Sequence, residues 1–150
     1  MKAIIQRVQH ARVVVDGETV GSTGTGLMVL LGAARGDGED DVRWIARKMA
    51  EMRIFSDVDG KFNLGLGDVD GRILLISQFT LLADTRKGRR PSFLDAAPPE
   101  EAEALVNLCA KHLREMGVHV ETGRFGAQME VSLLNDGPVT ILLDSRMREA

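Results

Sequence analysis

Residues 129–143 read Met-Glu-Val-Ser-Leu-Leu-Asn-Asp-Gly-Pro-Val-Thr-Ile-Leu-Leu, two strand-forming segments that enclose a Gly-Pro pair. Proline donates no backbone hydrogen bond and glycine weakens a strand, so Gly137 and Pro138 do not fit ordinary positions of a sheet ladder. We therefore expect the pair at a tight turn, or at a point where the backbone meets a ligand. Because the chain lacks the usual catalytic side chains, an enzyme with this sequence would rely on its backbone for much of its chemistry.

The earlier part of the chain predicts further strands and turns. Apolar residues alternate on both sides of Asp16-Gly17, a frequent hairpin turn, and residues 27–31 form the short apolar run of a buried strand. Asp59-Gly60 and Asp70-Gly71 mark two more turns, and residues 72–82 form the most apolar strand. These signals predict a protein rich in strands.

Two helices are expected among the strands. The first spans residues 39–52, where apolar residues recur at helical spacing, with Asp37 and Asp40 at the positions of an N-cap and of a first-turn acid. The second begins at Pro98-Pro99 and ends before Gly117.

Two helices are few for so many strand faces, so the sheet must wrap around or double up. We expect one α/β domain over residues 1–150. Its three layers are β/β/α, a barrel-like double sheet with both helices packed on one side. No linker, internal repeat or low-complexity segment divides the sequence.

The composition is that of an ordinary globular protein, with 44% hydrophobic and 27% charged residues. No apolar run reaches the roughly 18 residues of a membrane span, and the first residues are amphipathic, unlike a signal peptide. A single cysteine, Cys109, excludes an internal disulfide and fits a reducing compartment, so a cytoplasmic location is expected.

The net charge of −3 does not predict nucleic-acid binding by the whole surface. Four cations nevertheless occur within five residues, at Arg86, Lys87, Arg89 and Arg90. A solvated loop explains this cluster. A local phosphate contact also explains it, because such a contact needs a patch and not a basic protein.

The sequence carries no recognisable metal or nucleophile motif. His10, His112 and His119 are scattered, without the spacing of metal ligands, and His112 and His119 are expected to be ordinary surface or edge residues. Cys109 falls on the apolar stripe of a predicted helix, which indicates a core residue. No Gly-x-Ser-x-Gly elbow occurs. We expect neither a metal nor a cofactor.

Three short segments remain to be explained. Residues 21–26 are rich in glycine but fit neither dinucleotide nor Walker spacing, so they predict a strand connection. Residues 57–60 lack the glutamate of a calcium loop and predict a hairpin turn. Ser77-Gln78-Phe79-Thr80 ends the most buried strand, where side chains can face a ligand, but a threonine nucleophile needs a neighbouring base and none is visible.

Five motifs together resemble the D-aminoacyl-tRNA deacylase family, in order and over the full length of the chain. They are Ile5-Gln6-Arg7-Val8, Ser77-Gln78-Phe79-Thr80-Leu81, Arg90-Pro91-Ser92-Phe93, Thr122-Gly123-Arg124-Phe125 and Asn135-Asp136-Gly137-Pro138-Val139-Thr140. The family cleaves the ester between a D-amino acid and the terminal adenosine of tRNA, and it also removes glycine from mischarged tRNA. The resemblance implies a homodimer with both sites at the subunit interface, and tRNA as partner, with neither DNA nor a membrane.

The resemblance also implies roles for individual residues. Ser77, Gln78, Phe79 and Thr80 would form the floor of the pocket, with backbone amides around Phe79 and Thr80 facing the ester carbonyl. Further roles follow from the other motifs: Gly137 and Pro138, joined by a cis peptide, would enter the partner subunit's pocket, Arg7 would brace their loop, and Ala102, Phe125 and Met129 would line the slot for the adenine.

This arrangement accounts for the missing catalytic side chains. Backbone amides can stabilise the developing oxyanion, and the ribose 2′-hydroxyl can orient the attacking water, so the protein need not supply a base. If the carbonyls of Gly137 and Pro138 hold the substrate's ammonium, an L side chain points into the wall, whereas hydrogen or a D side chain clears it.

Two alternatives stay open. The first is a non-catalytic module that binds the tRNA acceptor end, with Phe125 stacking on a base and residues 86–90 contacting phosphates. The second is an acyl hydrolase that uses Thr80 as a covalent nucleophile.

Overall fold

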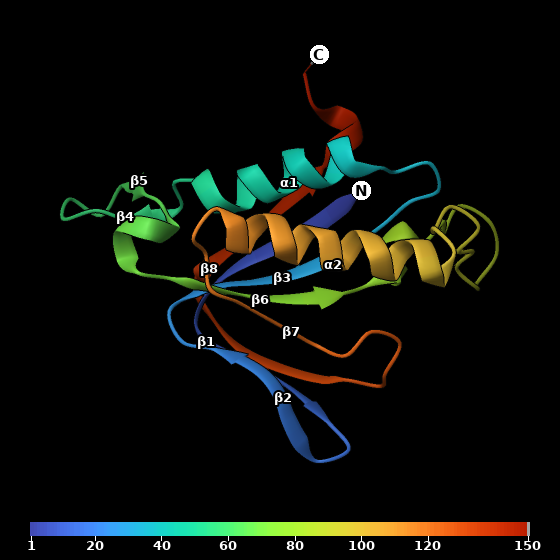
Figure 1. The fold of residues 1–150 in the computed structure, drawn as a ribbon, viewed down its shortest axis with the longest axis horizontal. Coiled ribbons are helices and arrows are strands. Elements are labelled where there is room, and N and C mark those ends of the chain that lie inside the picture. Colours follow the sequence, from blue (N-terminus) through green and yellow to red (C-terminus); the bar gives the residue numbers. More distant parts are fainter. Residues whose placement is uncertain (150) are drawn as a thin grey trace.

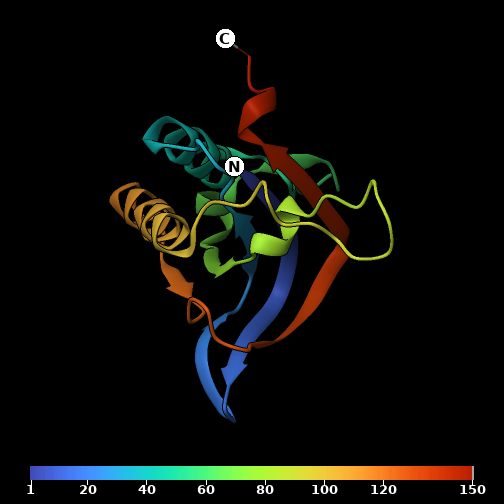
Figure 2. The ribbon, with the colours of Figure 1, turned by 90° about the vertical axis from the view of Figure 1, so that its right-hand side faces the viewer.

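Two long helices cover one face of a strongly curved six-stranded sheet, and a two-stranded hairpin lies at its end (Figures 1 and 2). The computed structural model describes residues 1–149. The strands are β1 Lys2–Val15, β2 Glu18–Thr23, β3 Gly26–Gly32, β4 Phe55–Ser56, β5 Phe62–Leu64, β6 Arg72–Ser77, β7 Val120–Thr122 and β8 Glu130–Asp144. The helices are α1 Glu39–Glu51 and α2 Pro99–Glu115, with short 3₁₀ turns η1 Leu66–Val69, η2 Phe79–Leu82 and η3 Ser145–Met147.

The long strand β1 gives the sheet its curvature. Its first half pairs with β3 and its second half with β2, both antiparallel, while β8 runs along its other edge for almost its whole length. The strand order is β2-β1-β3-β6-β7, and the β3–β6 and β6–β7 pairs are parallel. The far ends approach each other, since the Ser22 amide on β2 donates to the Glu121 carboxylate on β7 at 3.0 Å. The sheet is therefore nearly closed, like a barrel.

The central strands are buried on both faces, which explains their unbroken apolar runs. Leu27 and Leu31 of β3 belong to the core under the helices, whereas Met28 between them belongs to a second core inside the bend of the sheet. Leu75 and Leu74 of β6 divide between the two cores in the same way. One folded-over sheet thus supplies both β layers of the predicted β/β/α arrangement, and that prediction is confirmed.

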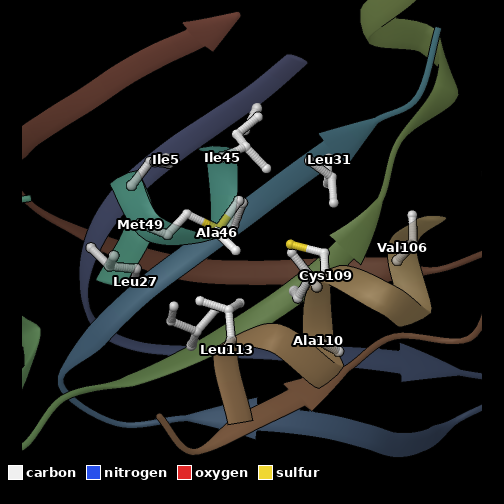
Figure 3. Packing of buried hydrophobic residues seen from close by; sticks show 14 of the residues in the cluster. Ile5, Leu27, Leu31, Ile45, Ala46, Met49, Val106, Cys109, Ala110 and Leu113 are labelled. Atoms are coloured by element: carbon white, nitrogen blue, oxygen red, sulfur yellow. The ribbon is translucent and has the colours of Figure 1, made fainter. Parts of the chain in front are cut away.

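The two helices form the third layer through their apolar stripes (Figure 3). The buried residues are Val42, Ile45, Ala46 and Met49 of α1, and Ala102, Val106, Cys109, Ala110 and Leu113 of α2. Both helices follow the predicted bounds closely. Cys109 is fully buried, and this burial raises the pKa of its thiol to about 12.

The N-cap prediction for α1 is wrong. Gly38 occupies the cap position, and Asp41 accepts a hydrogen bond from the Gly38 amide at 2.9 Å. Asp37 instead accepts from the Ala34 amide and pairs with the Met1 ammonium, 2.6 Å from its Oδ2. The Met1 ammonium comes from a distant part of the sequence, so the local spacing of residues around Asp37 could not reveal that its carboxylate binds Met1 and does not cap α1.

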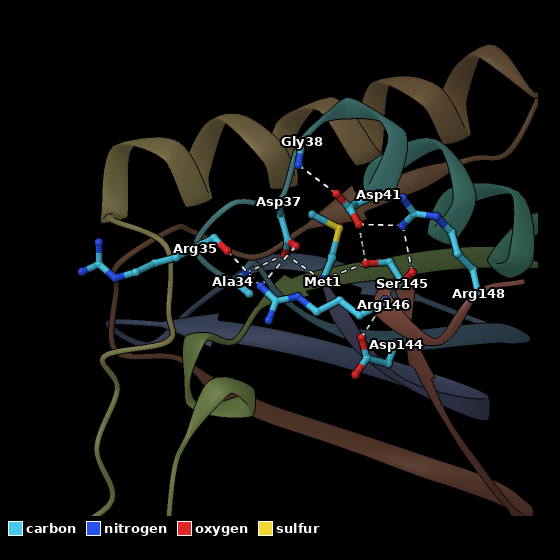
Figure 4. Close-up of polar contacts among 10 residues, drawn as sticks. All are labelled: Met1, Ala34, Arg35, Asp37, Gly38, Asp41, Asp144, Ser145, Arg146 and Arg148. Carbon is cyan, nitrogen blue, oxygen red and sulfur yellow. Dashed lines mark hydrogen bonds and ion pairs between the residues drawn. The ribbon is translucent and has the colours of Figure 1, made fainter. Parts of the chain in front are cut away.

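A polar network ties the start of the chain to α1 and to the C-terminal segment (Figure 4). The Met1 ammonium donates to Ser145 Oγ at 2.9 Å, and Ser145 Oγ donates to Asp41 Oδ1 at 2.7 Å. Arg148 donates to the same carboxylate oxygen at 2.7 Å. Partial burial alone would raise the pKa of Asp41. The hydrogen bonds from Gly38, Ser145 and Arg148, together with the charge of the N-terminus, outweigh it and lower this pKa to about 2.

The Gly137-Pro138 pair does not form a hairpin turn, so that part of the prediction is wrong. Strand β8 continues through the pair, with Asn135 opposite Val8 and Thr140 opposite Gln6 of β1. Between these two pairs, residues 136–139 of β8 face Arg7 alone, so the strand bulges outward by three extra residues. We call residues 136–139 the β8 bulge. Both Gly137 and Pro138 are exposed on it, and their peptide bond is cis, as the resemblance implies.

Candidate active site

A pocket of about 870 Å³ lies between the end of β6, the start of α2 and the segment that follows β7. Its volume is in the usual range for small-molecule sites. Six residues singled out from the sequence line it: Ser77, Gln78, Phe79, Ala102, Phe125 and Met129. The fold thus brings together three separate stretches of the chain.

The pocket floor is built where β6 ends and η2 begins. The Gln78 amide still donates to Leu31 of β3 at 2.8 Å, and the Leu81 amide donates to Gln78 O at 3.3 Å. The amides of Phe79 and Thr80 lie between them and donate to no acceptor among residues 1–149. The first amides of a helical turn have no partner within it, so two free N–H donors occur here, one on the lining residue Phe79 and one on Thr80 beside the floor.

Thr80 lies next to the pocket without lining it. Its hydroxyl is exposed and accepts a hydrogen bond from the side-chain amide of Gln78. An amide N–H is a donor and cannot take up the hydroxyl proton. The contact therefore positions Thr80 without activating it.

The opposite wall is apolar and shaped by small residues. Ala102 lies in the first turns of α2, and Phe125 and Met129 lie in the segment between β7 and β8. A Cβ atom on Gly123 would come within 2.6 Å of Met129 Sδ, so Gly123 leaves the room that Met129 needs. Gly123 belongs to the Thr122-Gly123-Arg124-Phe125 motif, but the sequence alone did not indicate this role.

An aromatic pair borders the pocket. The rings of Phe79 and Phe93 pack edge to face with centroids 5.0 Å apart, and Phe79 remains 55% exposed. Arg35, which the sequence did not single out, also lines the pocket and is the one charged residue among its lining residues in the described chain.

Arg7 anchors the β8 bulge, and neither the bulge nor Arg7 lines this pocket. The Arg7 guanidinium donates to Asp136 O at 2.9 Å and to Ile54 O at 2.8 Å, and it lies 5.5 Å from the centre of the Phe62 ring. Its side chain is only 11% exposed. Within one chain, the residues predicted as the chirality filter are thus separate from the pocket they are expected to serve.

The predicted cationic segment is an exposed loop closed by backbone hydrogen bonds of 2.8 and 2.9 Å between Asp84 and Ser92 (Figure 2, yellow-green). Arg86 folds back on Asp84 with hydrogen bonds of 2.9 and 2.8 Å, and this contact lowers the pKa of the Asp84 carboxyl to about 2. Lys87, Arg89 and Arg90 form no ion pair with any residue in 1–149. We call residues 84–92 the cationic loop, and three of its four cations are free.

The remaining titratable candidates lie outside the pocket. His112 is partly exposed, at 19%, and is more enclosed than the sequence suggested; its ring nitrogens lie 3.6 Å from the carboxylates of Glu39 and Glu115. Within residues 1–149, no group of three or more His, Cys, Asp or Glu side chains could hold a metal ion. No helix in this part of the chain is long and apolar enough to cross a membrane.

Comparison with known proteins gives consistent matches. A family model described as D-Tyr-tRNA(Tyr) deacylase matches residues 4–144. The D-aminoacyl-tRNA deacylase of Dehalococcoides mccartyi strain CBDB1 is 58% identical over 148 residues, covering 99% of this chain and 97% of the relative. That of Halalkalibacterium halodurans is 55% identical over 146 residues, covering 97% of this chain and all of the relative.

Two solved structures share the fold. A c-Myc DNA unwinding element binding protein superposes with a TM-score of 0.89 at 40% identity, covering 96% of this chain and 98% of that one. A probable eukaryotic D-amino acid tRNA deacylase superposes with a TM-score of 0.81 at 17% identity, covering 95% and 97%. At that identity the second match concerns the fold alone.

Proposed function

The chain belongs to the D-Tyr-tRNA(Tyr) deacylase family and hydrolyses D-aminoacyl-tRNA, and from this premise we propose that the ester is cleaved in the pocket between β6 and α2. One observation carries the proposal. The pocket joins a polar floor, formed by Ser77, Gln78 and Phe79, to an apolar wall formed by Ala102, Phe125 and Met129, and the free amide of Phe79 at the end of this floor is followed by that of Thr80 beside it. The floor suits the ester, and the wall suits an adenine base.

The chemistry follows from the two free amides. Attack of water on the ester carbonyl puts negative charge on its oxygen, and two preorganised N–H donors stabilise that charge. Ser77 and Gln78 add polar groups at the same end of the pocket. The adenosine 2′-hydroxyl, which neighbours the ester on the ribose, orients the water. The protein then needs no side-chain base and no acyl-enzyme intermediate.

The β8 bulge acts as the chirality filter of a second subunit. Its exposed Gly137 and Pro138 project from a strand whose outer edge pairs with no strand among residues 1–149, and Leu142 on that strand is 62% exposed. These features support a homodimer in which each bulge enters the other pocket. The Gly137 and Pro138 carbonyls bind the substrate ammonium, so an L side chain meets the wall. Light scattering at twice the 16.4 kDa chain mass checks the assembly.

The free cations of the cationic loop, Lys87, Arg89 and Arg90, contact tRNA phosphates and add affinity without choosing the amino acid. Arg86, already paired with Asp84, contributes less. Membership of a hydrolase family disfavours a purely non-catalytic tRNA-binding module. We also propose a cytoplasmic location and no DNA partner, although one structural relative is named for binding a DNA element.

A single-turnover assay on matched D- and L-aminoacyl-tRNA tests the proposed function. We expect release of the D-amino acid and of glycine, with the L-ester left intact. Binding of the tRNA without release of amino acid would instead favour the non-catalytic module. A trapped acyl group on Thr80 would favour the covalent mechanism.

A further inference from the structure

Arg35 is fixed to the wall of the pocket by both its backbone and its side chain. It follows β3, where the neighbouring Ala34 forms a bridge with Ala96 of the segment leading into α2. The Arg35 amide donates to Asp95 O at 2.9 Å, and its Nε donates to Leu94 O at 2.7 Å. An arginine held in this way has already lost much of its conformational freedom before any ligand arrives.

The rest of the Arg35 guanidinium is unused. Its Nη1 and Nη2 groups make no hydrogen bond or ion pair with any residue in the described chain, although the Asp95 backbone is adjacent. The side chain is exposed and points away from the polar network around Asp37 (Figure 4). Nη1 and Nη2 of this pocket-lining residue therefore remain available as donors. They lie in one plane, and their spacing suits two oxygen atoms of a phosphate group.

The chemistry of the substrate decides what this cation can bind. The amino acid of an aminoacyl-tRNA carries an ammonium, which a guanidinium repels. The adenine and the ribose are neutral. For an amino acid without an acidic side chain, the anion covalently nearest to the ester is the phosphodiester on the 5′ side of the terminal nucleotide.

We propose that Arg35 binds the phosphate of the terminal nucleotide and so fixes the acceptor end over the pocket floor. The proposal rests on the proposed function, since it presumes that the terminal adenosine occupies the pocket. It differs from the role of the cationic loop, which lies outside the pocket and contacts phosphates farther along the tRNA. Arg35 is a binding residue for one phosphate and takes no part in the chemical step.

Three substrates with different phosphate content test this proposal. They are D-aminoacyl-tRNA, adenosine 5′-monophosphate with the D-aminoacyl ester on its ribose hydroxyl, and adenosine with the same ester on its ribose hydroxyl. Arg35→Gln should lower kcat/KM about tenfold on the first two, mainly through KM, and leave the adenosine ester unchanged. Arg35→Lys should recover part of the lost kcat/KM, because lysine keeps the positive charge but lacks the two parallel N–H donors of the guanidinium group. The salt dependence of tRNA binding should fall by about 0.7 in slope, as expected for one contact to single-stranded RNA.

The matched control is Arg47→Gln, which removes the same charge from an exposed position on α1 outside the pocket lining. It should leave all three substrates unaffected. Equal losses by Arg35→Gln on all three esters, together with a lower melting temperature, would show that Arg35 only supports the wall and would overturn the proposal. Unchanged tRNA cleavage would overturn it as well. If the parent protein itself fails on D-aminoacyl-tRNA, the proposed function is at fault and not the phosphate contact.

Discussion

Replacing Gly137 by alanine should disable the β8 bulge while leaving the fold intact. Gly137 has φ of +141°, a region that side-chain-bearing residues rarely adopt. An added Cβ would lie 2.8 Å from Val139 Cγ2, 3.0 Å from Val139 N and 3.3 Å from Arg7 Nη2. A backbone conformation of this kind costs a residue other than glycine about 1–3 kcal/mol. Displacing the bulge relieves both problems, since the flanking pairs Gln6–Thr140 and Val8–Asn135 do not involve residues 136–139.

A cost of that size reduces the population of the native bulge by roughly 5- to 150-fold, and cleavage of D-aminoacyl-tRNA should fall by a similar factor. The measurements are D and L deacylation rates, mass by light scattering and melting temperature. Gly17→Ala is the matched control, because Gly17 also has positive φ, +81°, but its Cβ would meet nothing within 4 Å. It should lose some stability and no activity. A Gly137→Ala protein that cleaves the D-ester at the parental rate would refute the assignment of the filter to the bulge.

Four further predictions concern other parts of the molecule. Arg7→Ala leaves the carbonyl oxygens of Asp136 and Ile54 without their hydrogen-bond donor, which should lower the free energy of unfolding by about 1–3 kcal/mol. The loosened bulge should also discriminate less well against L-aminoacyl-tRNA. Denaturant unfolding measures the first effect, and the ratio of D to L deacylation rates measures the second. Thr80→Ala should reduce deacylation less than tenfold, whereas loss of a sole nucleophile costs about 10⁶-fold, so single-turnover rates separate the two mechanisms. Replacing the three free cations of the cationic loop by alanine should lower the salt slope of tRNA binding by about 2 without changing the D/L ratio, and a collapsed ratio would assign the loop to amino acid recognition. Asp41 has a pKa lowered from 3.8 to about 2 in the folded protein, so its stabilisation is present above pH 3.8 and is lost as the pH falls towards 2; acid unfolding of Asp41→Asn should lack this component.

The spacing of apolar residues predicted those helices and strands that bury one face or both faces regularly along their length. The apolar stripe around Ile45 indicated that α1 is buried on one face, and the continuous apolar run around Leu74 indicated that β6 is buried on both faces. The spacing of apolar residues reflects burial, so these elements could be predicted from it. Strand partners are not encoded in this way. Gly137 and Pro138 were therefore predicted at a tight turn or at a ligand contact and not within a continuous strand, because nothing near Pro138 indicates that β1 continues alongside it.

The candidate site was predicted only where motifs carried it. Ser77 and Phe125 were identified through resemblance and share the pocket, although their spacing alone does not imply contact. Arg35 was missed because a solitary arginine after a strand has no distinguishing pattern, and its position depends on the segment before α2. The partial burial of His112 was not predicted for the same reason, since the Glu39 carboxylate beside it comes from another helix.

The β8 bulge holds its own shape before anything binds to it. Asn135 accepts from the Val139 amide at 3.0 Å and donates to Thr140 Oγ1 at 3.1 Å, while Arg7 of the same chain holds Asp136. Ordering a flexible loop on docking costs about 1–2 kcal/mol per residue, and this segment has met that cost during folding. Any surface that receives the bulge therefore does not have to order it, and only the rigid-body and desolvation costs of docking remain to be offset by the contacts.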